Sequence, residues 1–167
     1  TSTSNVSCNG GSDGSATATV TGGTAPFNYV WTPGGGTTAT INGLSAGTYS
    51  VVITDAAACV TTGSATITEP SVFTATTTGS NPSFCGGSDG TAMAIPTGGV
   101  SPFSYSWDSS TGNQTTQIAI GLAAGNYSVT ITDGNGCTAL GSTALSDPGG
   151  TTLTSSSTDP TACGLTD

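Results

Sequence analysis

Hydrophobic and polar residues alternate along several short segments of the chain, and this alternation predicts β-strands. Phe27, Tyr29 and Trp31 alternate with other residues, which is the period expected of a strand with one buried face. Glycine-rich and Asn-Gly stretches separate such segments, as turns require. No segment keeps a helical period, so the sequence predicts an all-β fold. The same alternation recurs, strongly or weakly, in 16–20, 49–53, 65–67 and 127–131.

The chain repeats itself at an interval of 76 to 78 residues. Three motifs of the first half return in the second: Cys8–Gly14 at 85–90, Gly22–Trp31 at 98–107, and Leu44–Asp55 at 122–133. The offset is 76 or 77 in the first two motifs and 78 in the third. A small insertion is therefore expected in the connection near Ser109–Thr116, because connections tolerate changes in length better than strands do.

This repetition predicts the domain organisation. Short strands at this spacing are typical of a β-sandwich, so we expect tandem sandwiches of about 78 residues. Repeat 1 is expected to span 1–70 without its first strand segment, repeat 2 to span 71–148, and 149–167 to form a linker and the start of a third repeat. A chain that begins and ends within a repeat indicates a piece of a longer array. A two-domain protein with a frayed tail is the alternative.

Five cysteines recur with the repeat. Cys8 and Cys59 are 51 residues apart, and Cys85 and Cys137 are 52 residues apart. We expect one disulfide within each repeat, Cys8–Cys59 and Cys85–Cys137, with Cys163 pairing outside this sequence. Closing a loop of about 50 residues stabilises a small domain by roughly 4 kcal/mol in the chain-entropy model. A zinc site is disfavoured because the chain has no His and no Cys-x-x-Cys motif.

The repeated motifs resemble a known family. They read Cys-x-Gly-Gly-Ser-Asp-Gly, then Gly-Gly-x-x-Pro-Phe-x-Tyr-x-Trp, then Leu-x-Ala-Gly-x-Tyr-x-Val-x-Ile-x-Asp, a second Cys, and an acidic residue before Pro. This pattern is similar to the SprB-type repeat of gliding adhesins and other surface proteins of Bacteroidota. The Pro-Phe-x-Tyr-x-Trp segment also resembles PKD-type immunoglobulin-like domains. The resemblance implies tandem immunoglobulin-like (PKD-like) β-sandwiches, secretion to the cell surface by a type IX-like route, and a role in adhesion or gliding motility.

The charge of the chain excludes several kinds of partner. The sequence contains no Lys, Arg or His, and nine acidic residues give a net charge of −9. Nucleic acid is therefore not expected as a partner, because phosphate binding relies on Lys and Arg. Membrane insertion is not expected either, because no apolar run approaches the roughly 20 residues of a membrane span. The chain does not open with a signal peptide, so export implies a signal on a larger precursor.

The absence of basic residues also disfavours an enzyme. General acid–base catalysis near neutral pH relies most often on His, and a serine nucleophile would lack a His or Lys base. A glycosidase with paired carboxylates stays formally open, but the few acidic residues recur at equivalent turn positions, as scaffold residues do.

Calcium and glycans are the two bound groups that the sequence makes possible. Asp13 and Asp89 lie in Gly-Ser-Asp-Gly, where a carboxylate either binds calcium or shapes a tight turn; the turn is the favoured interpretation. Glycans are a second expectation. The Ser/Thr-rich connections 76–80 and 151–158 are candidates for O-linked sugar or are plain linkers. Three sequons also fit N-glycosylation, and they begin at Asn5, Asn113 and Asn126.

Taken together, these patterns predict a non-enzymatic, extracellular protein. The leading hypothesis is a structural shaft of a bacterial cell-surface adhesin or filament, whose partners are further copies of the same repeat. The alternative is a module that binds carbohydrate or another surface polymer through its end loops. An array of threonines that binds ice is a third idea, but the spacing of Thr is too irregular for it.

Overall fold

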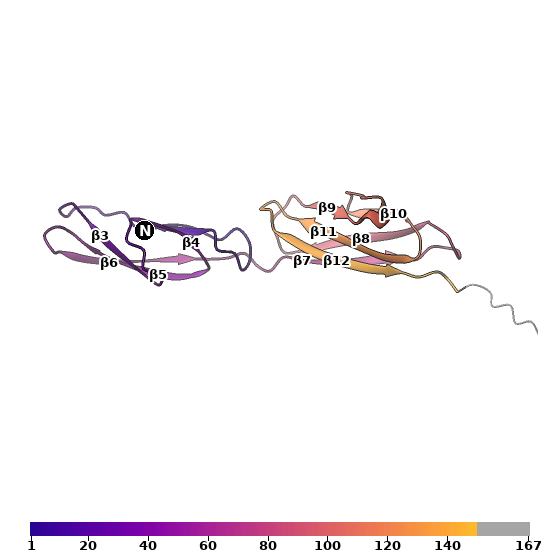
Figure 1. The fold of residues 1–167 in the computed structure, drawn as a ribbon, viewed down its shortest axis with the longest axis horizontal. Coiled ribbons are helices and arrows are strands. Elements are labelled where there is room, and N and C mark those ends of the chain that lie inside the picture. Colours follow the sequence, from indigo (N-terminus) through magenta and orange to yellow (C-terminus); the bar gives the residue numbers. More distant parts are fainter. Residues whose placement is uncertain (150–167) are drawn as a thin grey trace, which may run out of the picture.

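The computed structural model describes residues 1–149, and it confirms the all-β prediction. Two β-sandwiches of six strands each lie end to end along the long axis of the molecule (Figure 1). The first contains β1 (Ser2–Ser4), β2 (Gly14–Thr17), β3 (Asn28–Thr32), β4 (Thr40–Leu44), β5 (Gly47–Thr54) and β6 (Val60–Ile67). The second contains β7 (Thr74–Ser80), β8 (Gly90–Thr97), β9 (Ser104–Trp107), β10 (Ile118–Leu122), β11 (Gly125–Thr132) and β12 (Thr138–Leu145).

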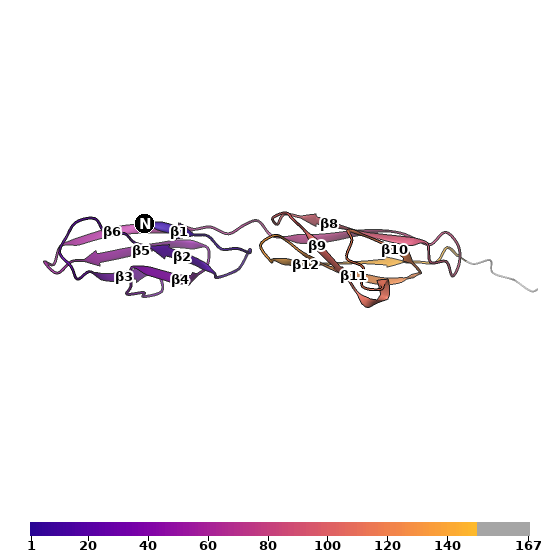
Figure 2. The ribbon, with the colours of Figure 1, turned by 90° about the horizontal axis from the view of Figure 1, so that it is seen from above.

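Each sandwich is made of two three-stranded sheets with the same strand order. One sheet has the order β1-β2-β4 in the first sandwich and β7-β8-β10 in the second, and the other has β3-β5-β6 and β9-β11-β12. These orders correspond to strands A-B-E and C-F-G of the immunoglobulin fold. Figure 2 shows the strands of both sandwiches from above. The fold is therefore an immunoglobulin-like β-sandwich.

The pairing register is the same in both sandwiches. The hairpin β5–β6 pairs eight residues, from Gly47 with Ile67 to Thr54 with Val60. The hairpin β11–β12 pairs eight residues in the same way, from Gly125 with Leu145 to Thr132 with Thr138. The bounds of the repeats, 1–70 and 71–148, stay predictions.

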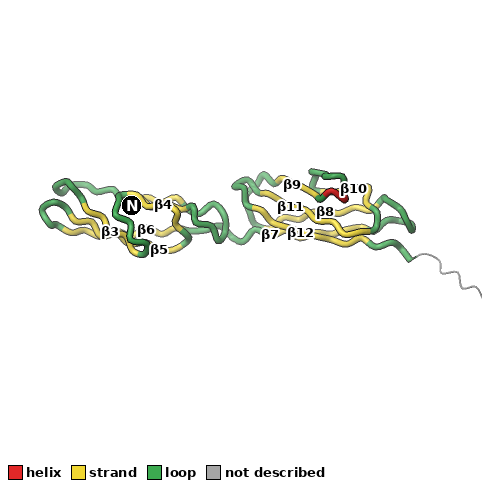
Figure 3. The backbone as a smooth tube through the Cα atoms, in the orientation of Figure 1, coloured by secondary structure: helices red, strands yellow, loops and turns green. Residues whose placement is uncertain are grey.

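The two sandwiches differ in one connection and in the lengths of several strands. A 3₁₀ helix, η1 (Ser109–Thr111), occupies the connection in which the sequence predicts an insertion, and it is the red segment of Figure 3. The first strand has three residues in β1 and seven in β7, and the strand paired with it has four residues in β2 and eight in β8. The expectation that 76–80 form a connection is wrong, because these residues pair with β8 as part of β7.

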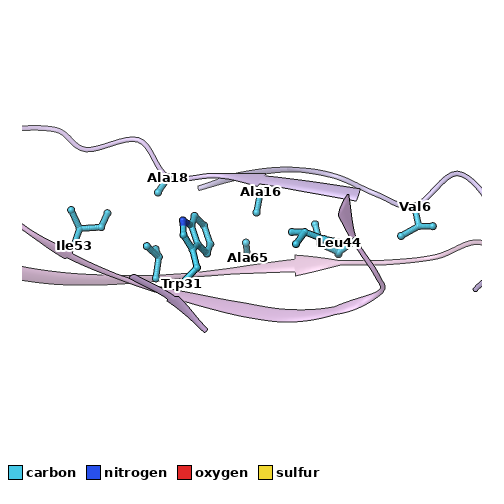
Figure 4. Packing of buried hydrophobic residues seen from close by; sticks show 9 residues of the cluster. Val6, Ala16, Ala18, Trp31, Leu44, Ile53 and Ala65 are labelled. Carbon is cyan, nitrogen blue, oxygen red and sulfur yellow. The ribbon is translucent and has the colours of Figure 1, made fainter. Parts of the chain in front are cut away.

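A buried tryptophan anchors each core. Trp31 of β3 is 1% exposed and Trp107 of β9 is 2% exposed. Trp31 Nε1 donates a hydrogen bond to the Thr38 carbonyl at 3.0 Å, and Trp107 Nε1 donates to Thr116 at 2.9 Å. The ring thus buries its apolar area while its polar group keeps a partner. Figure 4 shows small and branched side chains around Trp31 in the first core.

A tyrosine at the start of the central strand fixes the neighbouring corner. Tyr49 Oη donates to the Ser45 carbonyl at 3.1 Å, and Tyr127 Oη donates to the Ala123 carbonyl at 2.8 Å. This is the tyrosine corner of immunoglobulin-like sandwiches, in which the hydroxyl bonds to backbone a few residues upstream. Both sandwiches therefore share the tyrosine corner as well as the strand topology.

Antiparallel hairpins place the loops of each sandwich at its two opposite ends. The β5–β6 turn lies at the outer end of the first sandwich, and the β7–β8 loop lies at the outer end of the second (Figure 1). The β1–β2 loop and the β11–β12 turn instead face the junction between the sandwiches (Figure 1). The ends of one sandwich are separated by strands of eight residues, which corresponds to about 25 Å.

Candidate functional site: the junction between the sandwiches

One disulfide joins the two sandwiches. Cys8 of the β1–β2 loop is bonded to Cys137 of the β11–β12 turn, with a Cα–Cα distance of 5.7 Å and a sequence separation of 129 residues. The predicted bonds Cys8–Cys59 and Cys85–Cys137 within the repeats are therefore wrong. So is the expectation of one disulfide inside each sandwich.

The reason for this pairing is the position of the loops. Cys8 and Cys59 lie at opposite ends of the first sandwich, and Cys85 and Cys137 lie at opposite ends of the second. A disulfide requires a Cα–Cα distance of 4.4–6.8 Å, whereas the ends are about 25 Å apart. Cysteines of one repeat cannot meet, but cysteines of successive repeats meet at the junction.

Two hydrogen bonds hold the Cys8 loop against the end of its own sandwich. Asn9 Nδ2 donates to the Pro70 carbonyl at 3.0 Å, and the Gly10 amide donates to Glu69 Oε2 at 2.6 Å. Glu69 and Pro70 open the segment that leads into the second sandwich. The Cys8 loop and this connecting segment are therefore tied together on the near side of the junction.

A buried aspartate organises the turn that carries Cys137. Asp133 is 6% exposed. Its Oδ1 accepts hydrogen bonds from the amides of Asn135 at 2.9 Å and Cys137 at 2.8 Å, and its Oδ2 accepts from the Val100 amide at 2.9 Å. A buried carboxylate needs such partners, and here they fix the backbone at Cys137. The sulfur of Cys137 is thus held next to Cys8 by a rigid turn.

Polar contacts across the junction accompany the disulfide. Asn135 Nδ2 donates to the Ser7 carbonyl at 3.2 Å, and Cys137 Sγ lies 3.5 Å from the same oxygen. The turn of the second sandwich therefore touches two successive residues of the first, Ser7 and Cys8.

The two calcium candidates are turn residues. Asp13 Oδ1 accepts from the Ser7 amide at 3.0 Å. Asp89 Oδ1 accepts from the Ser83 amide at 2.9 Å, and its Oδ2 accepts from Ser83 Oγ at 2.5 Å. Among residues 1–149 no group of three or more His, Cys, Asp or Glu side chains is placed to hold a metal ion. Asp13 and Asp89 are not brought together, since they lie in different sandwiches.

Hydrogen bonds lower the pKa of five aspartates. Ser7 lowers the pKa of Asp13, Ser83 that of Asp89, and Ser110 that of Asp108. The Thr24 and Cys59 amides lower the pKa of Asp55. Burial alone raises the pKa of Asp133, but the amides of Val100, Cys137 and Asn135 outweigh burial, and the pKa lies below its ordinary value.

These shifts predict how stability depends on pH. An aspartate whose pKa is lower in the folded state stabilises the fold above its unfolded pKa, near 3.9, and loses this contribution as the pH falls through the folded value. We therefore expect a constant melting temperature between about pH 5 and 7, since the chain has no His, and a fall below about pH 4.

Thermal unfolding followed by circular dichroism at several pH values measures this dependence. Asp133→Asn keeps an oxygen acceptor but no charge, so this variant is expected to melt lower at pH 7 and to lose less on acidification. Asp147→Asn is the matched control, because Asp147 accepts one hydrogen bond, from the Gly86 amide at 3.2 Å, in place of the three that Asp133 accepts. A melting temperature that declines steadily from pH 7 to 5 would contradict the expectation.

Two further cysteines are free. Cys59 and Cys85 are exposed thiols among the described residues. Cys163 and the candidate sugar segment 151–158 lie outside the described residues. The side chain of one sequon, Asn5, accepts a hydrogen bond from the Thr68 amide at 3.0 Å, so it supports the end of its sandwich next to the junction.

Sequence reasoning missed the role of the junction. The intervals within a repeat are compatible with both patterns of bonding, because a repeat array offers the same cysteines within and between repeats. The positions of the cysteines relative to the strands could have distinguished the two patterns of bonding. Cys59 lies in the hairpin turn between the strands at 49–53 and 65–67. Cys8 instead precedes a different strand, at 16–20. Placing these turns at opposite ends of a sandwich excludes a bond within the repeat.

Among the described residues, no helix has both the length and the apolar character to span a membrane.

No curated protein matches the chain. Structural similarity is found to the N-terminal four Ig domains of Dscam1 isoform 9.44, with 14% identity and a TM-score of 0.35, over 73% of this chain and 37% of that one. It is also found to the N-terminal eight Ig domains of Down Syndrome Cell Adhesion Molecule isoform 1.30.30, with 14% identity and a TM-score of 0.37. That alignment covers 83% of this chain and 21% of the larger one.

The chain thus spans well under half the length of these solved structures, and at such scores the similarity carries no argument about function. The family comparison is more specific. Residues 1–36, which include the Cys8 loop and the β3 tryptophan, match the model of the SprB repeat. This result confirms the resemblance over the segment matched. The SprB repeat is a repeat of surface proteins, and the match is consistent with an extracellular location.

Proposed function

We propose that this chain is a non-enzymatic shaft segment of an extracellular surface protein or filament. Its task is to hold successive β-sandwiches in a straight, stiff line. The observation that carries the proposal is the disulfide Cys8–Cys137, which bonds the facing ends of two sandwiches that are already continuous in the chain. Sandwiches linked by one peptide segment alone move relative to each other by default; a second covalent link restricts that motion.

The surroundings of this bond support a mechanical role. Asp133 holds one cysteine in a rigid turn, Glu69 and Pro70 hold the loop of the other, and Asn135 adds a hydrogen bond between the sandwiches. Two connections at one junction resist bending and twisting together, whereas a single linker resists neither. The SprB match at residues 1–36 supports the surface setting in which such a shaft works.

Small-angle X-ray scattering of the oxidised protein and of a variant without the disulfide, Cys8→Ser/Cys137→Ser, tests the proposal. The oxidised chain is expected to give the profile of one extended particle with both sandwiches in line. The Cys8→Ser/Cys137→Ser variant is expected to keep its circular dichroism spectrum but to show a broad distribution of lengths. Equal distributions in the two proteins would overturn the proposed stiffening.

A further inference from the structure

Strand β10 of the second sandwich lies at the edge of its sheet, whose order is β10-β8-β7. The Ala94 amide of β8 donates to the Gln117 carbonyl at 3.0 Å, and Ala119, two residues on, pairs with the same strand. Alternate residues of an antiparallel edge strand turn their N–H and C=O groups away from the sheet. Ile118 and Ile120 therefore direct their backbone groups outward.

The side chain of Gln114 covers the outward groups of Ile120. Its Oε1 accepts a hydrogen bond from the Ile120 amide at 3.0 Å, and its Nε2 donates to the Ile120 carbonyl at 2.9 Å. These two bonds are the pair that a residue of an adjacent antiparallel strand makes. The outward carbonyl of Ile118 accepts from Thr116 Oγ1 at 2.6 Å. A side-chain amide thus takes the place of a neighbouring strand.

The 3₁₀ helix η1, which lies beside β10 (Figure 3), holds this amide in position. Gln114 Nε2 also donates to the Thr111 carbonyl, in η1, at 2.9 Å. One orientation of the amide satisfies all three partners, because its nitrogen has two protons and its oxygen accepts. The Gln114 carbonyl accepts from the Trp107 amide of β9 at 3.0 Å, and β9 is the edge of the other sheet. The inserted connection therefore bonds to the edges of both sheets.

The first sandwich has a glycine in the place of Gln114. The Gly36 carbonyl accepts from the Trp31 amide at 2.9 Å, as the Gln114 carbonyl accepts in the second sandwich. Glycine has no side chain that could reach β4, the counterpart of β10. A Cβ at this position would overlap Ile41 Cγ2, so a larger residue would displace Ile41. The amide that covers β10 therefore has no equivalent at this position of the first sandwich.

The side chains of the two edge strands differ in the same sense. Ile118 and Ile120 of β10 are 45% and 62% exposed. Their counterparts in β4 are the polar residues Thr40 and Asn42. An exposed apolar edge strand readily pairs with another chain, whereas Asn is unfavourable in strands. The covered edge is thus the one with the stronger tendency to pair.

We propose that Gln114 keeps β10 from pairing with β10 of a second copy of this chain. With Gln114 in place, the N–H and C=O of Ile120 are already bonded, and a second strand would have to displace the amide. Without it, two β10 strands pair antiparallel about a two-fold axis and extend the β10-β8-β7 sheet across both copies. The residues of β10 carry no charge that would oppose this pairing. The inference goes beyond the proposed shaft and does not rest on it.

Hydrogen exchange of single amides, measured by NMR on the oxidised protein, tests whether Gln114 covers the strand. In Gln114→Ala the Ile120 amide is expected to exchange about tenfold faster, because it loses its hydrogen bond. The Ala119 amide, which pairs with β8, is the internal reference. Gln117→Ala is the matched control, since Gln117 Nε2 donates to the Ala94 carbonyl at 3.0 Å and not to β10. An unchanged exchange rate at Ile120 in Gln114→Ala would overturn the proposal.

Sedimentation velocity at the concentrations used for NMR tests the effect on association. With free thiols alkylated, the unmodified protein and Gln117→Ala are expected to be monomers, and Gln114→Ala is expected to be a dimer. Adding Ile120→Lys to Gln114→Ala is expected to restore the monomer, because a charged side chain blocks an edge strand. A monomeric Gln114→Ala, or a dimer that persists with Ile120→Lys, contradicts the proposed role of Gln114.

A second variant keeps the test decisive if alanine disturbs the connection. Gln114→Met has a side chain of similar length without an amide, and it is expected to give the same fast exchange at Ile120 and the same dimer. Circular dichroism and Trp107 fluorescence report whether each variant is folded. Slow exchange at Ile120 in folded Gln114→Met would count against the proposal. The scattering test of the shaft depends on Cys8–Cys137 and not on Gln114, so the two proposals fail separately.

Discussion

Replacing Trp31 with Ala is expected to unfold the first sandwich at much lower urea than the second. The side chain is 1% exposed and forms the centre of its core. Truncating a buried tryptophan to alanine costs about 3–5 kcal/mol, and a domain of about 70 residues has a free energy of unfolding of only about 3.5–10 kcal/mol. The variant therefore loses a large share of the stability of that sandwich.

The two tryptophans make this effect measurable for each sandwich separately. The chain has two Trp, so in Trp31→Ala the fluorescence of Trp107 reports the second sandwich alone. We expect its urea transition to stay in place, while circular dichroism shows an earlier loss of β-structure. Val30→Ala, at a side chain 46% exposed on the same strand, is the matched control and is expected to change stability by less than about 0.5 kcal/mol. A Trp107 transition that shifts as far as the circular dichroism signal would show that the sandwiches unfold as one unit.

Removing the disulfide between the sandwiches is expected to give the other large effect. The Cys8–Cys137 bond closes a stretch of 129 residues, for which the chain-entropy model gives a stabilisation of about 5 kcal/mol. The full stabilisation applies only when both sandwiches unfold, because the bond then restricts the unfolded chain between Cys8 and Cys137, which includes most of both sandwiches. The Cys8→Ser/Cys137→Ser variant is therefore expected to lower the summed free energy of unfolding by up to this amount.

Urea titration of the oxidised protein and of this double variant measures the difference. The matched control is Cys59→Ser/Cys85→Ser, which replaces the two exposed free thiols and leaves the disulfide in place. We expect no change in the control. A similar loss in both double variants would contradict the assignment of Cys8–Cys137 as the stabilising bond.

The fold was predictable because its signals are local. The alternation in Phe27, Tyr29 and Trp31 and in 127–131 predicts strands with one buried face, and the structure buries Trp31, Tyr127, Val129 and Ile131. Strands with few large apolar residues were harder to predict. Residues 76–80 read as a Ser/Thr-rich connection, yet they form most of β7, because backbone pairing with β8 overrides weak side-chain preference.

The disulfide was not predictable from spacing, because its partners depend on which ends of the sandwiches face each other. Cys8–Cys59 and Cys8–Cys137 use the same repeat positions, and only the position of the hairpin turns excludes the first.

The most direct test of this account is a disulfide map of the native, oxidised protein. The chain has no Lys or Arg, so digestion at acidic residues and at aromatic residues replaces trypsin, before mass analysis with and without reduction. We predict a peptide pair that joins Cys8 to Cys137, with Cys59 and Cys85 of the monomer labelled by a thiol reagent. A peptide pair that joins Cys8 to Cys59 would place the bond inside the repeat and contradict the account.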